Sequence, residues 1–247
     1  MRSVTQPTVG RARCAAALLL AATALIGRPD LAPAAEEESS ILKFIEADQL
    51  EYRAGREDTF SWEAQGWIGG DYDKLWIKTQ GDDVIDGPVT DAEVQLLYSR
   101  TITAFWDLQI GARYDARPDP SRGLAVLGIQ GLAPYFFEVD AAAFVSDEGD
   151  VSARLEAEYE LLLTQRLIAK SSVELNVALQ EVEELGIGSG LSEVELGLRL
   201  RYEIVREIAP YIGLSWERKV GPTANFARRR GEDVSDVAFV AGVRFWY

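Results

Sequence analysis

The strongest constraint on the fold is an alternation of apolar and polar residues that recurs in segments of roughly ten residues, separated by turn-forming residues. In segment 151–163 every odd position is apolar or Ala, and positions 152 to 160 alternate with them as Ser, Arg or Glu. Segment 193–204 has the opposite parity. Successive side chains of a β-strand point to opposite faces. Each segment is therefore predicted to be a strand with one apolar and one polar face. Leu198 is then expected to face lipid and Gly197 to face the interior, so an arginine should be tolerated better at position 197 than at position 198.

One segment also fits a helix. Leu155, Tyr159 and Leu163 are spaced by four within residues 154–167, and the Glu, Ala and Leu residues there are strong helix formers. The alternation nevertheless continues through the whole segment, which favours a strand.

The same pattern predicts twelve strands in an all-β fold, a single antiparallel transmembrane β-barrel that the C-terminal strand closes against the first. An even number of strands is the rule for bacterial single-chain barrels. The expected strands are 47–53, 60–68, 73–79, 92–102, 106–114, 122–130, 135–145, 151–163, 168–180, 192–205, 209–219 and 236–247.

The connections between these strands alternate in length. Residues 80–91, 115–121, 181–191 and 220–235 are expected to be long, whereas 103–105, 132–134 and 206–208 are short. Long extracellular loops and short periplasmic turns are typical of outer-membrane barrels. Several aromatic residues near strand ends are predicted to form interfacial girdles, or alternatively to pack a core: Trp67, Trp76, Trp106, Tyr135 and Trp216.

The N-terminal region has the order of a secretory signal peptide. Three arginines precede an apolar run at residues 14–26, and small residues precede Glu36. We therefore expect a cleaved signal at 1–35, a short acidic linker at 36–46 and the barrel at 47–247. The expected location is the outer membrane of a Gram-negative cell, with outer-membrane lipid around the barrel.

The chain has no His, and its single Cys and single Met both lie within the expected signal, at positions 14 and 1. A Ser/His/Asp triad, a thiolate nucleophile and a His or Cys zinc site all need residues that 36–247 lacks. We expect no enzyme activity. A net charge of −15 also argues against nucleic acid as a partner.

Several longer motifs resemble the copper resistance protein B family. They begin with Leu50-Glu-Tyr-Arg and Gly66-Trp-Ile-Gly-Gly-Asp-Tyr-Asp-Lys-Leu-Trp, and continue with Gly128-Ile-Gln-Gly-Leu-Ala-Pro-Tyr-Phe-Phe-Glu-Val-Asp and Trp216-Glu-Arg-Lys. The resemblance covers roughly residues 47–247 in order. It implies an outer-membrane protein of copper resistance, with copper as the metal it handles and a periplasmic copper-binding protein as a possible partner. Many members carry a Met- and His-rich segment ahead of the barrel, whereas residues 36–46 here contain neither residue type. A general small porin, or a plugged barrel without a metal role, remains the alternative.

The expected interior carries opposed carboxylates. Pairing strands across residues 147–150 sets Glu138 opposite Glu158 and Asp140 opposite Glu156, and like charges in that position are destabilising unless a cation intervenes. These four residues are the candidate metal ligands, although oxygen ligands permit Cu(II) without selecting it. The alternative is a salt-bridge network with basic residues of neighbouring strands, namely Arg154, Lys170, Arg199 and Arg201.

Overall fold

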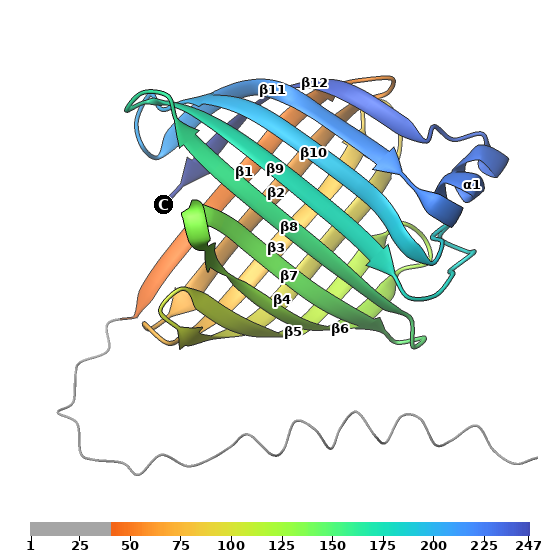
Figure 1. The fold of residues 1–247 in the computed structure, drawn as a ribbon, viewed down its shortest axis with the longest axis horizontal. Coiled ribbons are helices and arrows are strands. Elements are labelled where there is room, and N and C mark those ends of the chain that lie inside the picture. Colours follow the sequence, from red (N-terminus) through yellow and green to blue (C-terminus); the bar gives the residue numbers. More distant parts are fainter. Residues whose placement is uncertain (1–40) are drawn as a thin grey trace, which may run out of the picture. The chain divides into compact units, whose positions relative to one another are not determined.

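A computed structural model describes residues 41–247, which form twelve long strands and one short helix (Figure 1). The bounds are β1 Leu42–Ala54, β2 Asp58–Gly69, β3 Asp73–Val84, β4 Val89–Thr103, β5 Trp106–Arg117, β6 Arg122–Ala133, β7 Phe137–Ser146, β8 Val151–Leu162, β9 Leu167–Ala178, β10 Gly190–Tyr202, β11 Ile208–Lys219 and β12 Ser235–Trp246. A single turn of 3₁₀ helix, Pro134–Phe136, precedes β7, and helix α1, Gly221–Arg230, lies between β11 and β12. No helix within residues 41–247 is long and apolar enough to cross a membrane.

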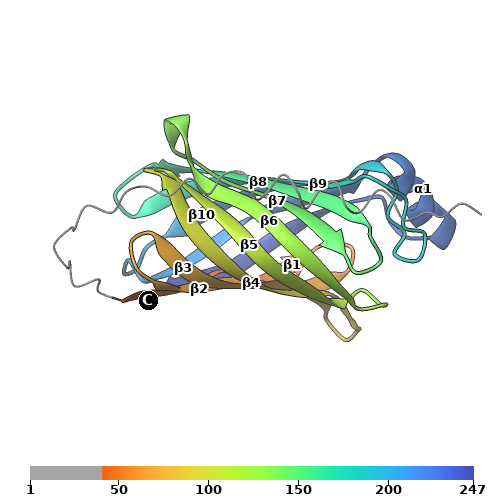
Figure 2. The same cartoon turned by 90° about the horizontal axis from the view of Figure 1, so that it is seen from below.

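The strands close into one antiparallel barrel. Each strand pairs with the next, and β12 pairs with β1 through partners such as Glu46 and Trp246. The tilted strands are seen from two sides in Figures 1 and 2. Closure satisfies the backbone hydrogen-bonding groups of both terminal strands, which a lipid environment requires. The predicted barrel, its strand number and its closure by the C-terminal strand are confirmed.

The main differences from the expected boundaries lie at two places. Strand β1 begins at Leu42, so residues 42–46 belong to the barrel and not to the linker. The connection expected at 80–91 is mostly strand, because β3 continues to Val84 and β4 begins at Val89. The polar composition of this segment suggested a loop, but Asp82 of β3 and Asp91 of β4 are direct cross-strand partners. Residues 154–162 are strand, so the helical alternative does not apply.

The barrel is apolar outside and largely polar inside. On β4, Val94, Leu96 and Tyr98 are exposed, whereas Glu93 and Ser99 are buried. Leu198 is 54% exposed on the outer face, as predicted. Gly197 does lie on the inner face, but a Cβ there would come within 2.3 Å of the Ser172 hydroxyl and 2.4 Å of the Arg199 guanidinium. An arginine at this position would require the ends of the Ser172 and Arg199 side chains to shift, and the expectation that it is tolerated better than one at Leu198 stays a prediction.

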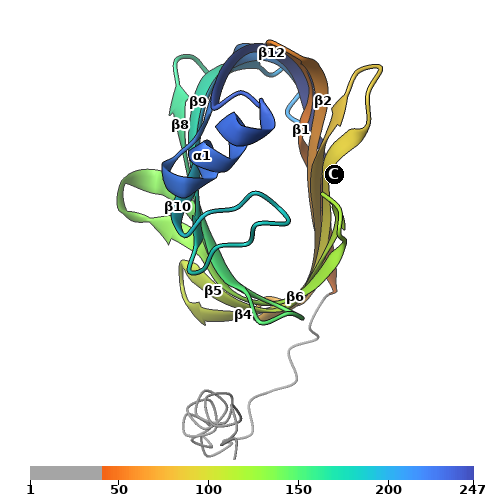
Figure 3. The same ribbon diagram turned by 90° about the vertical axis from the view of Figure 1, so that its right-hand side faces the viewer.

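The two longest connections, residues 179–189 and 220–234, lie at one end of the barrel. Short turns and the C-terminus lie at the other (Figure 1). By the usual loop rule the first end is extracellular. Helix α1 has Pro222 in its first turn, and Gly231, which follows its last residue, adopts the left-handed conformation. Its Thr223 hydroxyl accepts a hydrogen bond of 2.9 Å from the Gly188 amide, so α1 and the 179–189 connection pack together across part of this end (Figure 3).

The aromatic residues expected in girdles separate into two groups. Trp106 and Trp216 are on the outer face near strand ends, and Tyr135 is exposed in the turn before β7. Trp67 and Trp76 point inward instead. Together with Phe44 and Trp246 they form a row at the periplasmic end of the lumen, with neighbouring ring centroids 6.2 to 6.3 Å apart. For this pair the core alternative is correct, because their strand positions have inward parity.

Candidate functional site: the carboxylate-lined lumen

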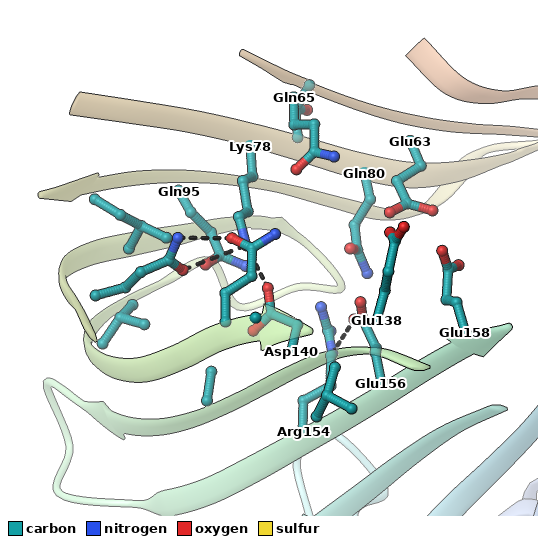
Figure 4. A pocket seen from close by; sticks show the side chains of 18 of the residues that line it. Glu63, Gln65, Lys78, Gln80, Gln95, Glu138, Asp140, Arg154, Glu156 and Glu158 are labelled. Carbon is teal, nitrogen blue, oxygen red and sulfur yellow. Dashed lines mark hydrogen bonds and ion pairs between the residues drawn. The ribbon is translucent and has the colours of Figure 1, made fainter. Parts of the chain in front are cut away.

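The four candidate ligands lie on two neighbouring strands, with the predicted register. Glu138 pairs with Glu158, and Asp140 pairs with Glu156, across β7 and β8. All four side chains line one cavity of about 320 Å³ inside the barrel (Figure 4). The tight connection at residues 147–150 sets this register, which is why it could be read from the sequence.

Cationic side chains accompany three of these four carboxylates. Asp140 contacts the Lys78 ammonium from β3, on the opposite wall. The Lys170 nitrogen lies 2.9 Å from Glu158, and Arg154 Nε lies 3.9 Å from Glu156. Within residues 41–247 Glu138 has no Lys or Arg nitrogen within 4.0 Å, and no group of three or more acidic residues is arranged to hold a metal ion. A metal ion at these residues would therefore compete with Lys78 and Lys170.

The salt-bridge alternative is also realised for the four basic residues expected to take part. Arg154 donates two hydrogen bonds to Glu93 across the lumen, at 3.1 and 3.0 Å. Arg201 lies 2.8 Å from Glu160. Two further residues complete the arrangement, since Lys170 also contacts Asp48 and Arg199 also contacts Glu51. Ion pairs therefore cross the interior and occupy much of it.

Two acidic residues of β1 hold the periplasmic half of the lumen together. The register of β1 shifts after Ala47 in its pairing with both β2 and β12, and at this bulge Asp48 contacts Lys170 at 2.5 Å and Arg244 at 3.2 Å. Glu51 accepts hydrogen bonds from Arg199, Arg53 and Tyr211 at 2.8 to 3.0 Å. Bulges cannot be located from the alternation alone, so Asp48 was not among the expected site residues.

A longer feature extends the predicted pairs, and we name it the carboxylate row. Six acidic residues on six successive strands are direct cross-strand partners, in the order Asp140, Glu156, Glu174, Glu195, Glu217 and Asp236. The row begins near the periplasmic end of β7 and reaches the extracellular start of β12. Among the described residues, Glu217 has no Lys or Arg nitrogen within 4.0 Å. Direct like-charge partners destabilise a sheet, so five successive pairs need cations nearby.

Three neighbouring cavities follow this row. The first shares Glu63, Glu156 and Glu158 with a second of about 340 Å³. The second shares Asp82 and Glu217 with a third of about 530 Å³ at the extracellular loops. Each cavity is lined by at least two members of the carboxylate row. The arrangement is a chain of acidic spaces from the extracellular end to the middle of the barrel.

A family model for "Copper resistance protein B precursor (CopB)" matches residues 41–247. The chain belongs to the copper resistance protein B family. It is 46% identical over 211 residues to copper resistance protein B of Escherichia coli, which covers 85% of this chain and 71% of that protein. It is 42% identical over 211 residues to the copper resistance protein B homolog of Pseudomonas syringae pv. tomato, again covering 85% of this chain and 71% of that protein. The family resemblance expected from the sequence is thus confirmed, and the protein is an outer-membrane β-barrel involved in copper resistance.

A solved structure supports the fold independently. The NanC porin superposes with a TM-score of 0.52 at 13% sequence identity, covering 83% of this chain and 99% of that chain. At this identity the likeness concerns the barrel architecture alone.

Proposed function

We propose that this family member takes copper ions into its lumen from the extracellular side and holds or passes them within the outer membrane. The observation that carries the proposal is the carboxylate row and the three neighbouring cavities that it lines. Carboxylates in a low-dielectric wall focus the electrostatic potential and concentrate cations. The proposal includes no catalytic step, because residues 36–247 contain no His, Cys or Met for nucleophilic or imidazole chemistry.

The available ligands make the binding unselective. Carboxylate and amide oxygens suit hard and borderline ions, whereas Cu(I) prefers sulfur. We expect weak binding of Cu(II) and little binding of Cu(I). Glu138, Asp140, Glu156 and Glu158 are the proposed contacts, since all four line the first cavity and together form two pairs of facing like charges.

Neutralising these four carboxylates together, by Glu→Gln and Asp→Asn, should abolish Cu(II) binding to the refolded barrel in calorimetry. The matched control removes four acidic charges from connections outside this cavity, at Glu148, Glu181, Glu184 and Glu207, and should leave binding unchanged. Copper affinity that survives the lumen substitutions would assign the ions to another part of the protein.

Deletion of the protein should lower the copper concentration at which the cells grow, with zinc tolerance much less affected. Growth of the deletion strain on graded copper and zinc measures this. The alternative, a general small porin, predicts equal effects on both metals or on neither. The cross-lumen ion pairs of Arg154 and Lys170 favour a filled interior over a wide aqueous channel.

The proposed partner is a periplasmic copper-binding protein that docks at the end of the barrel with short turns. Exposed aromatic residues gather there, in the turns containing Tyr72, Phe105 and Phe136. Those nearest the lipid would instead anchor the barrel at the membrane interface.

The expected signal, residues 1–35, lies outside the described residues. N-terminal sequencing of the protein extracted from outer membranes should begin near Glu36. Recovery of the mature chain in the soluble periplasmic fraction, or with an intact N-terminus, would contradict this processing.

A further inference from the structure

One wall of the first lumen cavity is apolar, and a hydrated metal ion would gain no favourable contact from it. On β4, β6 and β7 it is lined by Leu97, Val126 and Phe144, which belong to an apolar cluster that also includes Trp76. Five glutamines also line the cavity: Gln65, Gln80, Gln95, Gln109 and Gln130. The interior of a porin-like barrel is ordinarily polar, so an apolar patch inside the lumen is unusual.

The opposite side of the same cavity is acidic. Glu63, Glu138 and Glu158 turn into it from β2, β7 and β8 (Figure 4). Glu63 accepts a hydrogen bond of 2.6 Å from Gln49, and among residues 41–247 neither Glu63 nor Glu138 has a Lys or Arg nitrogen within 4.0 Å. The cavity therefore has an acidic side, on which Glu63 and Glu138 lack a direct ion-pair partner, and an apolar side. Lys78 and Arg154 also line it and pair with Asp140 and Glu93.

Its volume of about 320 Å³ falls in the range of sites that hold small organic ligands, ~300 to 1,000 Å³. A copper ion bound directly by protein oxygens needs converging ligands, and no such group of three or more acidic residues exists among residues 41–247. The same residues offer no nitrogen or sulfur side chain that copper prefers, since they contain no His, Cys or Met. An ion that entered with better ligands would gain nothing by exchanging them for carboxylates.

We infer that this cavity accepts copper as a cationic complex that keeps its own small organic ligands, with the carboxylates balancing the charge and the apolar wall contacting the ligand body. The inference rests on the proposed function and names the form in which copper enters the lumen. The protein contributes contacts to the outside of the complex and forms no bond to the metal.

The test uses the refolded full-length barrel and four probes in calorimetry: aqueous Cu(II), the 1:1 complex of Cu(II) with 2,2′-bipyridine, bipyridine alone, and hexaamminecobalt(III). The last cannot exchange its ligands, so its binding reports on charge and space only. We expect both complexes to bind more tightly than aqueous Cu(II), and bipyridine alone not to bind.

Two variants separate the two sides of the cavity. Val126→Thr keeps the side-chain shape and should weaken binding of the bipyridine complex about tenfold while leaving hexaamminecobalt(III) unchanged. Its control is Val240→Thr, because Val240 is also inward-facing and 3% exposed, as Val126 is, but lies on β12 outside this cavity. The double variant Glu63→Gln with Glu138→Gln should weaken both complexes, and the loop pair Glu181→Gln with Glu207→Gln should not.

Tighter binding of aqueous Cu(II) than of either complex would overturn the inference and leave copper entry as a bare ion. Absence of binding by every probe would also overturn the inference. If the deletion strain were nevertheless sensitive to copper, the proposed function would still stand. Equal effects of Val126→Thr and Val240→Thr would exclude the apolar wall as a contact. A normal copper tolerance of the deletion strain would instead refute the proposed function, whatever the probes show.

Discussion

Leu198→Arg should prevent stable assembly of the barrel. Leu198 is 54% exposed on the lipid-facing side of β10 and lies opposite Leu214 of β11, so an arginine there would have to enter the hydrocarbon layer. At the bilayer midplane this costs about 2 to 4 kcal/mol in a membrane barrel. Folded protein in outer membranes, detected as the band whose gel mobility changes on heating, should fall sharply.

The matched control places an arginine inside the barrel. Gln80 is in the middle of β3 and faces both the first and the second cavity, next to Glu156 and Glu158. Gln80→Arg finds space and opposite charge there and should assemble close to normally. Gly197→Arg is a less direct control, because the ends of the Arg199 and Ser172 side chains would have to shift to admit it. Equal damage from Leu198→Arg and Gln80→Arg would mean that the two faces are assigned wrongly.

Glu51→Gln should lower the free energy of unfolding by about 3 to 5 kcal/mol, the usual result of removing one partner from a buried ion pair. The Glu51 side chain is 0% exposed and accepts hydrogen bonds from Arg199, Arg53 and Tyr211. A neutral amide leaves Arg199 without its charged partner inside the barrel. Urea unfolding of the barrel reconstituted in lipid vesicles measures the change.

An exposed ion pair provides the comparison. Arg56 is 62% exposed in the β1–β2 connection, where it pairs with Asp233 and Asp236. Arg56→Gln should leave the free energy of unfolding nearly unchanged, because solvent screens an exposed ion pair. In addition, Glu51→Leu with Arg199→Met should be less damaging than Glu51→Gln alone, because no charge of that pair stays buried without a partner. A double variant that loses more stability than the single one would show that Glu51 acts mainly through Arg53 and Tyr211.

Much of the candidate site could be predicted because two strands joined by a tight connection have a short-range register. The facing pairs Glu138 with Glu158 and Asp140 with Glu156 follow from the four residues between β7 and β8. The extension of the carboxylate row from Glu174 on β9 to Glu195 on β10 could not be predicted in the same way. The long connection between β9 and β10, and a register shift after Leu191, both separate these strands. Sequence distance alone does not specify such a register.

The sequence by itself determined the barrel, its strand number, its apolar outer face and its family, because all of these depend on local alternation and on motifs in order along the chain. The tertiary structure decided which inward residues meet across the lumen. Lys78 of β3 contacts Asp140 of β7 across the lumen, and the bulge in β1 places Asp48 in contact with Lys170. Trp67 lies on the inward face of its strand and packs against Phe44 inside the barrel. Alternation defines the face of a residue but not its neighbours across a closed sheet, since those depend on the tilt and register of all twelve strands together.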